Sequence, residues 1–380
     1  MNKIKKQNLP SRHVSLGPKS SPHRSYYYAM GMTEKEIYQP FVGIATCWNE
    51  SAPCNISLSR QAQSAKKGVK DNTGTPREFT TITVTDGIAM GHEGMKSSLV
   101  SREIIADSIE VSMRGHCYDG LVGIAGCDKS LPGIMMAMLR LNVPAVFLYG
   151  GSILPGKHKN KEVTVQDVFE AVGEFDSNKI TEDELCDLEK VACPSAGSCG
   201  GQFTANTMAC VAEAIGLALP GSSSTPAPYE SRDKFAYDSG IKVMDLINMQ
   251  LKPRDIVNKK SLINAARIVA CSGGSTNAAL HLPALANEIG IDFDIMDVAK
   301  IFKETPYIAD LKPGGKYLAK DLHDIGGVPI IMKALLDGGF LDGSCLTVTG
   351  KTLKENLSSI NVDFDSQKII FSTKNPISKT

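Results

Sequence analysis

The stretch 123–133, GIAGCDKSLPG, constrains this chain more than any other feature. An apolar run at 121–125 predicts a buried strand, and three reactive side chains follow it directly: Cys127, Asp128 and Lys129. Ligands of open α/β sheets bind at the carboxyl ends of strands, so this placement favours a functional site. The alternative for these three residues is a buried structural cysteine beside a surface Asp–Lys ion pair.

The same succession of strand, glycine-rich turn and helix recurs along the chain. We expect Pro132 and Gly133 to close the first turn, before a helix over 134–141. Further strands are predicted at 41–46, 81–85, 145–149 and 345–348. Further helices are predicted at 58–69, 98–113, 202–219, 234–249, 262–270, 276–289, 295–302 and 328–336, with two surface helices that begin at Thr164 and Thr181. This alternation predicts an α/β fold with a largely parallel sheet and helices on both faces, in three layers.

The composition of the chain argues against nucleic acid and membranes as partners. Lys+Arg and Asp+Glu both total 41, so no overall charge favours nucleic acid, and no apolar run reaches the ~20 residues of a membrane helix. Residues 1–33 are basic and predict a flexible tail before one α/β domain at 34–380. Ten cysteines without a secretory signal indicate a reducing compartment, which we expect to be the cytoplasm. An organellar transit peptide is the alternative for the tail, although its basic residues are mostly lysine.

Three cysteines lie in turns that lead into helices, and we call them the turn cysteines: Cys54, Cys127 and Cys199. They are far apart in the sequence and form no local CxxC pair, so only the fold could bring them together. Three thiolates suit an iron–sulfur cluster with one iron not fully ligated by protein. A structural zinc ion and three unrelated core thiols remain alternatives.

Two carboxylates at strand ends and one lysine form a second candidate set, which we call the acid–lysine group: Asp86, Asp128 and Lys129. Paired carboxylates favour a hard divalent cation, typically magnesium. A charged lysine has no lone pair and cannot ligate a cation. Lys129 is therefore a salt-bridging neighbour, a deprotonated base, or a chemically modified ligand.

Five segments together resemble the dihydroxy-acid dehydratase family. They are TCWNESAPCN, TVTDGIAMGHEGM, GIAGCDKSLPG, PSAGSCGGQFTANTM and CSGGSTNAALHLPA, and the resemblance extends from about Ser25 to Thr380. It implies dehydration of 2,3-dihydroxy-3-methyl acids to 2-oxo acids in valine and isoleucine biosynthesis. Sugar-acid and phosphogluconate dehydratases share the scaffold and remain an alternative for the substrate.

The resemblance also implies the cofactors. The turn cysteines would ligate a [2Fe–2S] cluster rather than a [4Fe–4S] cluster, and the acid–lysine group would bind Mg²⁺. Lys129 would be carbamylated, which replaces its ammonium with an anionic oxygen ligand. The implied partners are a small dihydroxy acid and, for the full-length enzyme, a second copy of the chain in a homodimer, with no nucleic acid and no membrane.

Two departures from the family pattern concern Cys47, where a small polar residue is expected, and the length of the chain. Family members continue into a β-rich domain that carries a further glutamate ligand and the serine that takes the substrate's C2 proton. We therefore expect that residues 1–380 form the N-terminal domain of an incomplete enzyme, which folds but is inactive alone. The alternative is a non-catalytic iron–sulfur module.

Overall fold

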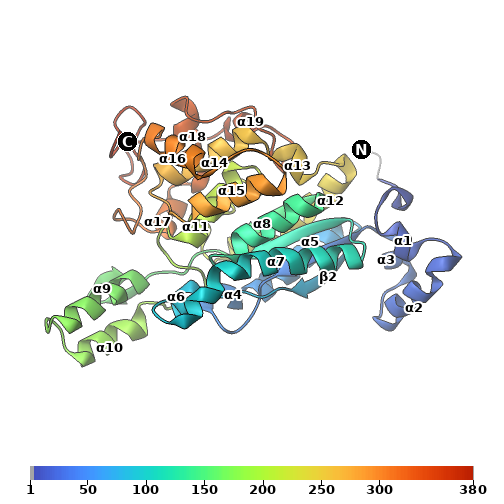
Figure 1. Ribbon diagram of the computed structural model, residues 1–380, viewed down its shortest axis with the longest axis horizontal. Coiled ribbons are helices and arrows are strands. Elements are labelled where there is room, and N and C mark those ends of the chain that lie inside the picture. Colours follow the sequence, from blue (N-terminus) through green and yellow to red (C-terminus); the bar gives the residue numbers. More distant parts are fainter. Residues whose placement is uncertain (1–3, 380) are drawn as a thin grey trace.

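A four-stranded parallel sheet forms the centre of the computed structural model, which describes residues 4–379 (Figure 1). The strands lie in the order β2-β1-β3-β4. Their bounds are β1 (Phe41–Thr46), β2 (Thr75–Thr80), β3 (Gly120–Ala125) and β4 (Ala145–Tyr149). Val42 of β1 pairs with Gly120, and Leu121 of β3 pairs with Ala145. Every residue of β1, β3 and β4 is buried, as expected for parallel strands covered on both faces.

Helices cover both faces of the sheet, which confirms the predicted three-layer α/β class. On one face α5 (Leu58–Asp71) packs against α12 (Glu230–Met249), and on the other α7 (Lys96–Gly115) packs against α8 (Ser130–Leu141). The chain moves outward from β1 to β2 but in the opposite direction from β3 to β4. Because such crossovers are right-handed, their helices fall on opposite faces.

Two predicted strands were wrong. The second strand is β2, at Thr75–Thr80, and residues 81–85 are irregular. The segment that ends in Pro76 was predicted only as the break after the helix over 58–69, and Pro76 cannot donate a ladder hydrogen bond. The sheet tolerates Pro76 because β2 is an edge strand. Residues 345–348 form an isolated bridge between Leu346 and Thr352 instead of a strand.

Helix α8 begins earlier than predicted, at Ser130 instead of residue 134. Pro132 and Gly133 lie in its first turn, where the N–H that proline lacks has no partner inside a helix. A Cβ on Gly133 would lie 2.8 Å from the Arg102 carbonyl oxygen, so glycine lets α8 approach α7 closely. The predicted turn after Lys129 is therefore shorter, and the helix starts directly at the candidate site.

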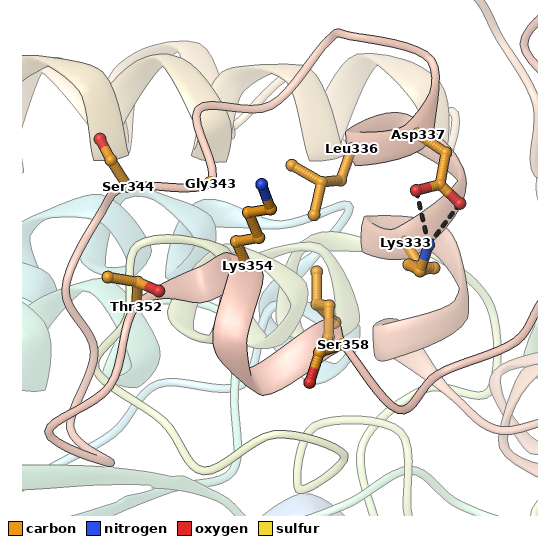
Figure 2. A pocket seen from close by; sticks show the side chains of 9 residues that line it. Lys333, Leu336, Asp337, Gly343, Ser344, Thr352, Lys354 and Ser358 are labelled. Carbon is orange, nitrogen blue, oxygen red and sulfur yellow. Dashed lines mark hydrogen bonds and ion pairs between the residues drawn. The ribbon is translucent and has the colours of Figure 1, made fainter.

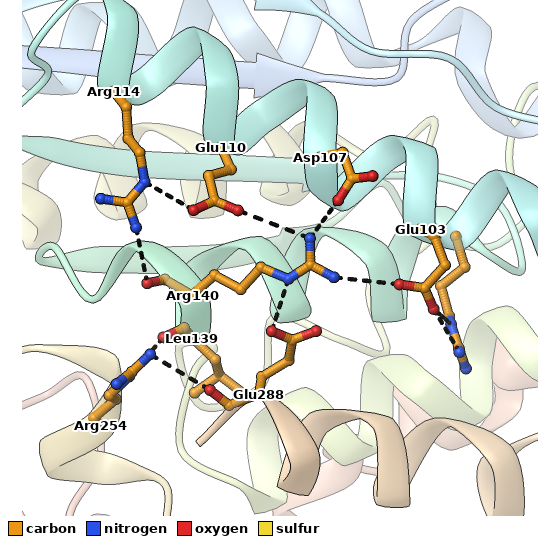
Figure 3. A network of polar contacts seen from close by, with 9 residues as sticks. Glu103, Asp107, Glu110, Arg114, Leu139, Arg140, Arg254 and Glu288 are labelled. Carbon is orange, nitrogen blue, oxygen red and sulfur yellow. Dashed lines mark hydrogen bonds and ion pairs between the residues drawn. The ribbon is translucent and has the colours of Figure 1, made fainter. Parts of the chain in front are cut away.

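The C-terminal end of α8 is held by ion pairs to two other helices (Figure 3). Arg140 Nε donates to Glu288 of α15 (Ala278–Glu288) at 2.7 Å, and Arg140 Nη2 lies 3.2 Å from Glu103 of α7. Arg140 also binds Asp107 of α7. These contacts join α7, α8 and α15.

The second half of the chain is mostly helical and packs onto the sheet layers as one continuous hydrophobic core. Its helices are α11 (Thr204–Ala214), α13 (Pro253–Ile256), α14 (Lys259–Cys271), α15, α16 (Ile295–Glu304), α17 (Ala319–Asp324), α18 (Val328–Asp337) and α19 (Leu353–Leu357). Short helical turns elsewhere are η1 (Lys6–Asn8), η2 (Pro18–Ser20), α4 (Pro53–Ile56), α6 (Asp86–Ala89) and η3 (Glu93–Met95). None of the described helices is long and apolar enough to cross a bilayer.

A projecting unit, which we call the arm, follows β4 (green in Figure 1). It contains β5 (Gly156–His158), β6 (Lys161–Val163), α9 (Val165–Asp176) and α10 (Glu182–Val191). The arm has a small core of its own around Val163 and Leu188. Thr164 and Thr181 cap the two helices with capping boxes, which confirms both predicted starts. The chain enters and leaves the arm at one place, because Ile153 N donates to the Ser198 carbonyl oxygen at 2.6 Å.

The N-terminal segment was predicted as a flexible tail, and this was wrong for residues 4–33. The segment forms α1 (Arg12–Ser15) and α2 (Ser21–Ala29) ahead of α3 (Glu34–Tyr38). Ser11 N donates to Asp119 Oδ1 at 2.8 Å, and Leu9 is buried in the main core. The basic composition suggested no core, but a few apolar residues and one buried carboxylate hold this segment to the sheet. Residues 1–3 lie outside the described part of the chain.

Candidate functional site

The candidate site lies at the carboxyl edge of the two central strands. From β1 the chain runs to β2, and from β3 it runs to β4, so the order of connection reverses between β1 and β3. Such a switch point leaves a crevice where ligands of α/β sheets bind. Cys54, in α4, follows β1, and Cys127 follows β3. The two turn cysteines therefore come from the two loops that border this crevice.

The loops after β1 and β3 are in direct contact. Cys54 and Cys127 form a small buried cluster with Ala52. A Cβ on Gly126 would lie 2.1 Å from the Cys54 carbonyl oxygen, so glycine is required for this approach. Thr85 Oγ1 lies 3.9 Å from Cys54 Sγ.

The loop of the third turn cysteine, Cys199, is bonded to both of the others. Gly197 N donates to the Pro53 carbonyl oxygen at 2.9 Å, next to Cys54. Ser198 Oγ donates to the Gly126 carbonyl oxygen, next to Cys127. Three loops far apart in the sequence therefore meet, as the iron–sulfur hypothesis requires.

A buried hydrogen-bonded pair supports the Cys199 loop from behind. Asn206 Nδ2 donates to the Cys199 carbonyl oxygen at 2.7 Å. The Tyr149 hydroxyl, at the end of β4, donates to Asn206 Oδ1 at 2.8 Å. The position of the Cys199 backbone is thus tied to the end of β4.

The turn cysteines differ in acidity. A hydrogen bond from the Cys54 thiol lowers the pKa of Cys127, whereas donating that bond, together with burial, raises the pKa of Cys54. Burial raises the pKa of Cys199 to about 12, and the negative charge of Asp128 acts in the same direction. Without a metal ion, Cys127 is thus the thiol most readily ionised of the three. Binding of a metal ion such as iron would favour the deprotonated thiolate at all three cysteines.

The acid–lysine group lies beside the cysteines. Asp86 is the first residue of α6, and Lys129 immediately precedes α8. Lys129 Nζ lies 2.6 Å from Asp86 Oδ2, and the Ser98 hydroxyl donates to Asp86 Oδ1. Only 3% of Lys129 and 7% of Asp86 is exposed, so this ion pair is desolvated. Burial and the charge of Asp86 raise the pKa of Asp128 to about 6, which shows that the two carboxylates are close enough to repel.

The donor atoms fit the two predicted cofactors differently. Three thiols at the meeting point of three loops match a cluster whose iron atoms take separate ligands. Among residues 4–379, however, no three His, Cys, Asp or Glu side chains are arranged to hold a single metal ion. Both oxygens of Asp86 already accept a hydrogen bond, one of them from the Lys129 ammonium, which repels a cation. The acid–lysine group therefore fits Mg²⁺ only once Lys129 has lost its positive charge.

The site contains polar residues that the sequence did not single out. Ser98 binds Asp86, and the Thr204 side chain acts to lower the pKa of Asp128, against the effect of burial. His281 is fully buried, with Nδ1 3.2 Å from Arg102 Nη1. Thr204 and His281 lie in the segments that carry the family resemblance, and that was their only signal. Ser98 had none, because a serine on a helix looks the same whether it faces solvent or a carboxylate.

Cys47 was noted as a departure from the family pattern. Its Sγ lies 3.7 Å from Asn55 Oδ1 and 3.8 Å from the Ile124 carbonyl oxygen. Burial raises its pKa to about 11. Cys47 therefore packs as a protonated core thiol.

A surface pocket of about 540 Å³ lies elsewhere, between α18 and α19 (Figure 2). Lys333 and Lys354 contribute to its lining, and Lys333 pairs with Asp337 at 2.5 Å. None of the turn cysteines or the acid–lysine group lines this pocket. The candidate chemistry is concentrated at the sheet edge.

Comparison with known proteins identifies the family. Residues 39–356 match the model of the dihydroxy-acid/6-phosphogluconate dehydratase N-terminal family. The chain belongs to this family. The dehydratase match includes the turn cysteines and the acid–lysine group, and it confirms the resemblance inferred from the five segments.

Individual dehydratases are similar along the whole chain. A dihydroxy-acid dehydratase of Pelagibacter ubique is 69% identical over 378 residues, covering 100% of this chain and 66% of that protein. One from Parvibaculum lavamentivorans is 68% identical over 375 residues, covering 99% and 65%. One from the more distant Sulfurisphaera tokodaii is 48% identical over 380 residues. The chain thus spans about 65% of the length of such relatives. The cofactors, their ligands and the homodimer stay predictions.

Proposed function

We propose that this chain carries the cluster- and metal-binding part of a dihydroxy-acid dehydratase. The reaction removes water from a 2,3-dihydroxy-3-methyl carboxylic acid. The C2 hydrogen leaves as a proton, the C3 hydroxyl leaves as hydroxide, and the resulting enol tautomerises to a 2-oxo acid. One observation supports this most: the six residues predicted from sequence meet at the switch point of the sheet. The printed names of the similar proteins support the choice of substrate class.

In this proposal the turn cysteines hold a [2Fe–2S] cluster, and Asp86, Asp128 and carbamylated Lys129 hold Mg²⁺. When bound, the two groups supply Lewis acidity toward the leaving C3 hydroxyl and toward the substrate's carboxylate and C2 hydroxyl. The proton acceptor for C2 is expected from the family resemblance to be a serine in a second domain.

The chain's own residues prepare this site in three ways. Ser98 orients Asp86 through a hydrogen bond, and the Thr204 side chain favours the charged form of Asp128 by acting to lower its pKa. Contact between the loops keeps water away from two of the three thiols, since Cys54 is 4% and Cys127 5% exposed, whereas Cys199 is partly exposed. In such a dry environment each charge acts more strongly on a reacting group than it would in water.

The cluster assignment is tested by anaerobic reconstitution of the chain with iron and sulfide, followed by iron analysis and visible absorbance. We expect Cys127→Ser and Cys199→Ser to lose most of the bound iron and the absorbance. Cys271→Ser is the matched control, because Cys271 is a buried thiol at the end of α14, outside the site. Iron contents equal in all four proteins would contradict the assignment.

The substrate class is tested with the same reconstituted chain, supplied with Mg²⁺ and bicarbonate and assayed for 2-oxo acid. We expect turnover far below that of a relative from Pelagibacter ubique assayed in parallel, since the proposal places the proton acceptor elsewhere. That relative should prefer a dihydroxy acid over gluconate. Comparable turnover by the chain would place the proton acceptor within residues 1–380.

A further inference from the structure

His281 carries a buried nitrogen with no hydrogen-bond partner. The side chain lies on α15 and is fully buried, with Nδ1 3.2 Å from Arg102 Nη1. Nε2 makes no hydrogen bond to any described residue. Buried polar atoms in native proteins are nearly always paired, so an unpaired one calls for a partner that the protein chain does not supply.

The contact with Arg102 decides which ring nitrogen carries the proton. A guanidinium can only donate hydrogen bonds, so His281 Nδ1 accepts. The ring is neutral, since burial and the charges of Arg102 and Lys129 lower the pKa of His281 to about 3. A neutral imidazole that accepts at Nδ1 carries its hydrogen on Nε2. The unpaired atom is therefore a donor and needs an acceptor.

The imidazole lies close to the acid–lysine group. Ser98 and Arg102 are one turn apart on α7, about 5.4 Å along the helix. Ser98 binds Asp86, which binds Lys129, and Arg102 binds His281. Lys129 and Asp86 both act electrostatically on His281, in opposite directions. Because residues four apart project from the same side of a helix, His281 and the Lys129–Asp86 pair are both held on this side of α7.

Lys129 itself offers this donor no acceptor while it is an ammonium. An ammonium has three donors and no acceptor. Asp86 already receives one hydrogen bond from Ser98 and one from Lys129. A buried unpaired donor and a buried ammonium thus lie on the same side of α7, and an anionic group on Lys129 would supply an acceptor that the ammonium cannot.

We propose that His281 is a positioning residue whose Nε2–H donates a hydrogen bond to a carbamate on Lys129. This inference rests on the proposed function, which makes Lys129 a carbamylated ligand. To form the carbamate, the ammonium gives a proton to water and the amine nitrogen bonds to the carbon of CO₂. One C=O electron pair moves to oxygen, and the nitrogen loses a second proton to water. The two carbamate oxygens then serve as acceptors, one for His281 and one for a metal ion.

The test is a titration with ¹³C-labelled bicarbonate without metal, which follows the carbamate resonance by NMR. The proteins are the unaltered chain, Lys129→Ala, His281→Leu, His281→Gln and His323→Leu. Gln retains an N–H near the Nε2 position. His323 is a half-buried histidine on α17 and serves as the matched control. Thermal unfolding of each variant shows whether it folds.

We expect the resonance in the unaltered chain and its loss in Lys129→Ala. His281→Leu should need roughly 10- to 100-fold more bicarbonate for half-occupancy, the effect of one lost hydrogen bond to a charged group. His281→Gln should restore most of the affinity, and His323→Leu should change nothing. If His281→Leu does not fold, the test compares the bicarbonate concentration at half-occupancy in His281→Gln with that in the unaltered chain.

Four results would overturn the proposal. An unchanged titration in folded His281→Leu, or a folded His281→Gln that behaves like a chain without the donor, removes the role of His281 and leaves carbamylation intact. No resonance in the unaltered chain, or its persistence in Lys129→Ala, instead refutes the carbamylated Lys129 of the proposed function, and the role of His281 with it.

Discussion

The two ends of α8 carry charged side chains in opposite circumstances. At its C-terminal end Arg140 contacts carboxylates of Glu288, Glu103 and Asp107, and 20% of its side chain is exposed. At its N-terminal end Lys129 has one close carboxylate, Asp86, and only 4% of its side chain is exposed. The Arg140 network satisfies its charges and holds three helices together. The N-terminal end retains two carboxylates, Asp86 and Asp128, that repel each other.

The largest expected effect comes from breaking the buried pair at the N-terminal end. Lys129→Met leaves Asp86 without its cation beside Asp128 in a desolvated site. We expect the metal-free chain to lose about 3–5 kcal/mol of unfolding free energy at neutral pH. Urea denaturation measures this. A loss below about 1 kcal/mol would mean that the pair is hydrated in solution and that the contrast between the ends fails.

Glu213 shows the effect of burial on a carboxyl group that does have hydrogen-bond partners. Glu213, on α11, is fully buried and accepts hydrogen bonds from Gly221 N at 2.9 Å and Ser223 N at 2.7 Å, yet burial raises its pKa to about 7. Because the pKa is raised, Glu213 contributes stability below about pH 4.5 that is lost as the pH rises through 7.

The size of the Glu213 effect is ~2–3 kcal/mol between pH 4.5 and 8. Glu213→Gln should remove this part of the pH dependence of the unfolding free energy, while Ser239→Ala, at a buried uncharged position on α12, should keep it. Identical pH profiles for the unaltered chain and Glu213→Gln would show that the carboxylate is not perturbed by burial.

The smallest effect is expected at the C-terminal end of α8. Arg140→Met removes ion pairs whose carboxylates are partly solvated, Asp107 being 62% exposed. We expect a loss of about 1–2 kcal/mol, which becomes smaller at high salt because exposed charges are screened. A loss equal to that of Lys129→Met, or one independent of salt, would erase the difference between the two ends.

The sequence predicted best what depends on neighbours along the chain. β1 and β4 have their predicted bounds because continuous apolar runs are typical of fully buried parallel strands. Strand-to-helix turns also placed Cys54 and Cys127 correctly at one edge of the sheet. The predictions failed where contacts between residues far apart in the sequence determine the local structure. Pro76 is tolerated only because β2 is at the edge, and the N-terminal helices are held by Asp119.

The sequence predicted the candidate ligand residues of the site but not the residues that hold them in place. Cys, Asp and Lys are chemically distinctive, and their glycine-rich surroundings mark them. Ser98 contacts Asp86 and His281 contacts Arg102 across different helices, and no spacing in the sequence encodes either contact. Such residues become visible only when hydrogen bonds are counted in three dimensions.

The arm begins and ends at adjacent points on the body of the protein, so its length and sequence can change independently of the body. Because the chain leaves the body at Ile153 and returns at Ser198 through paired backbone, everything between these points is a loop whose ends are fixed together. Insertions, deletions or a grafted module in 155–194 can vary in length without shifting the neighbouring thiol of Cys199. The arm is therefore where this scaffold can acquire new attachments while its chemistry stays in place.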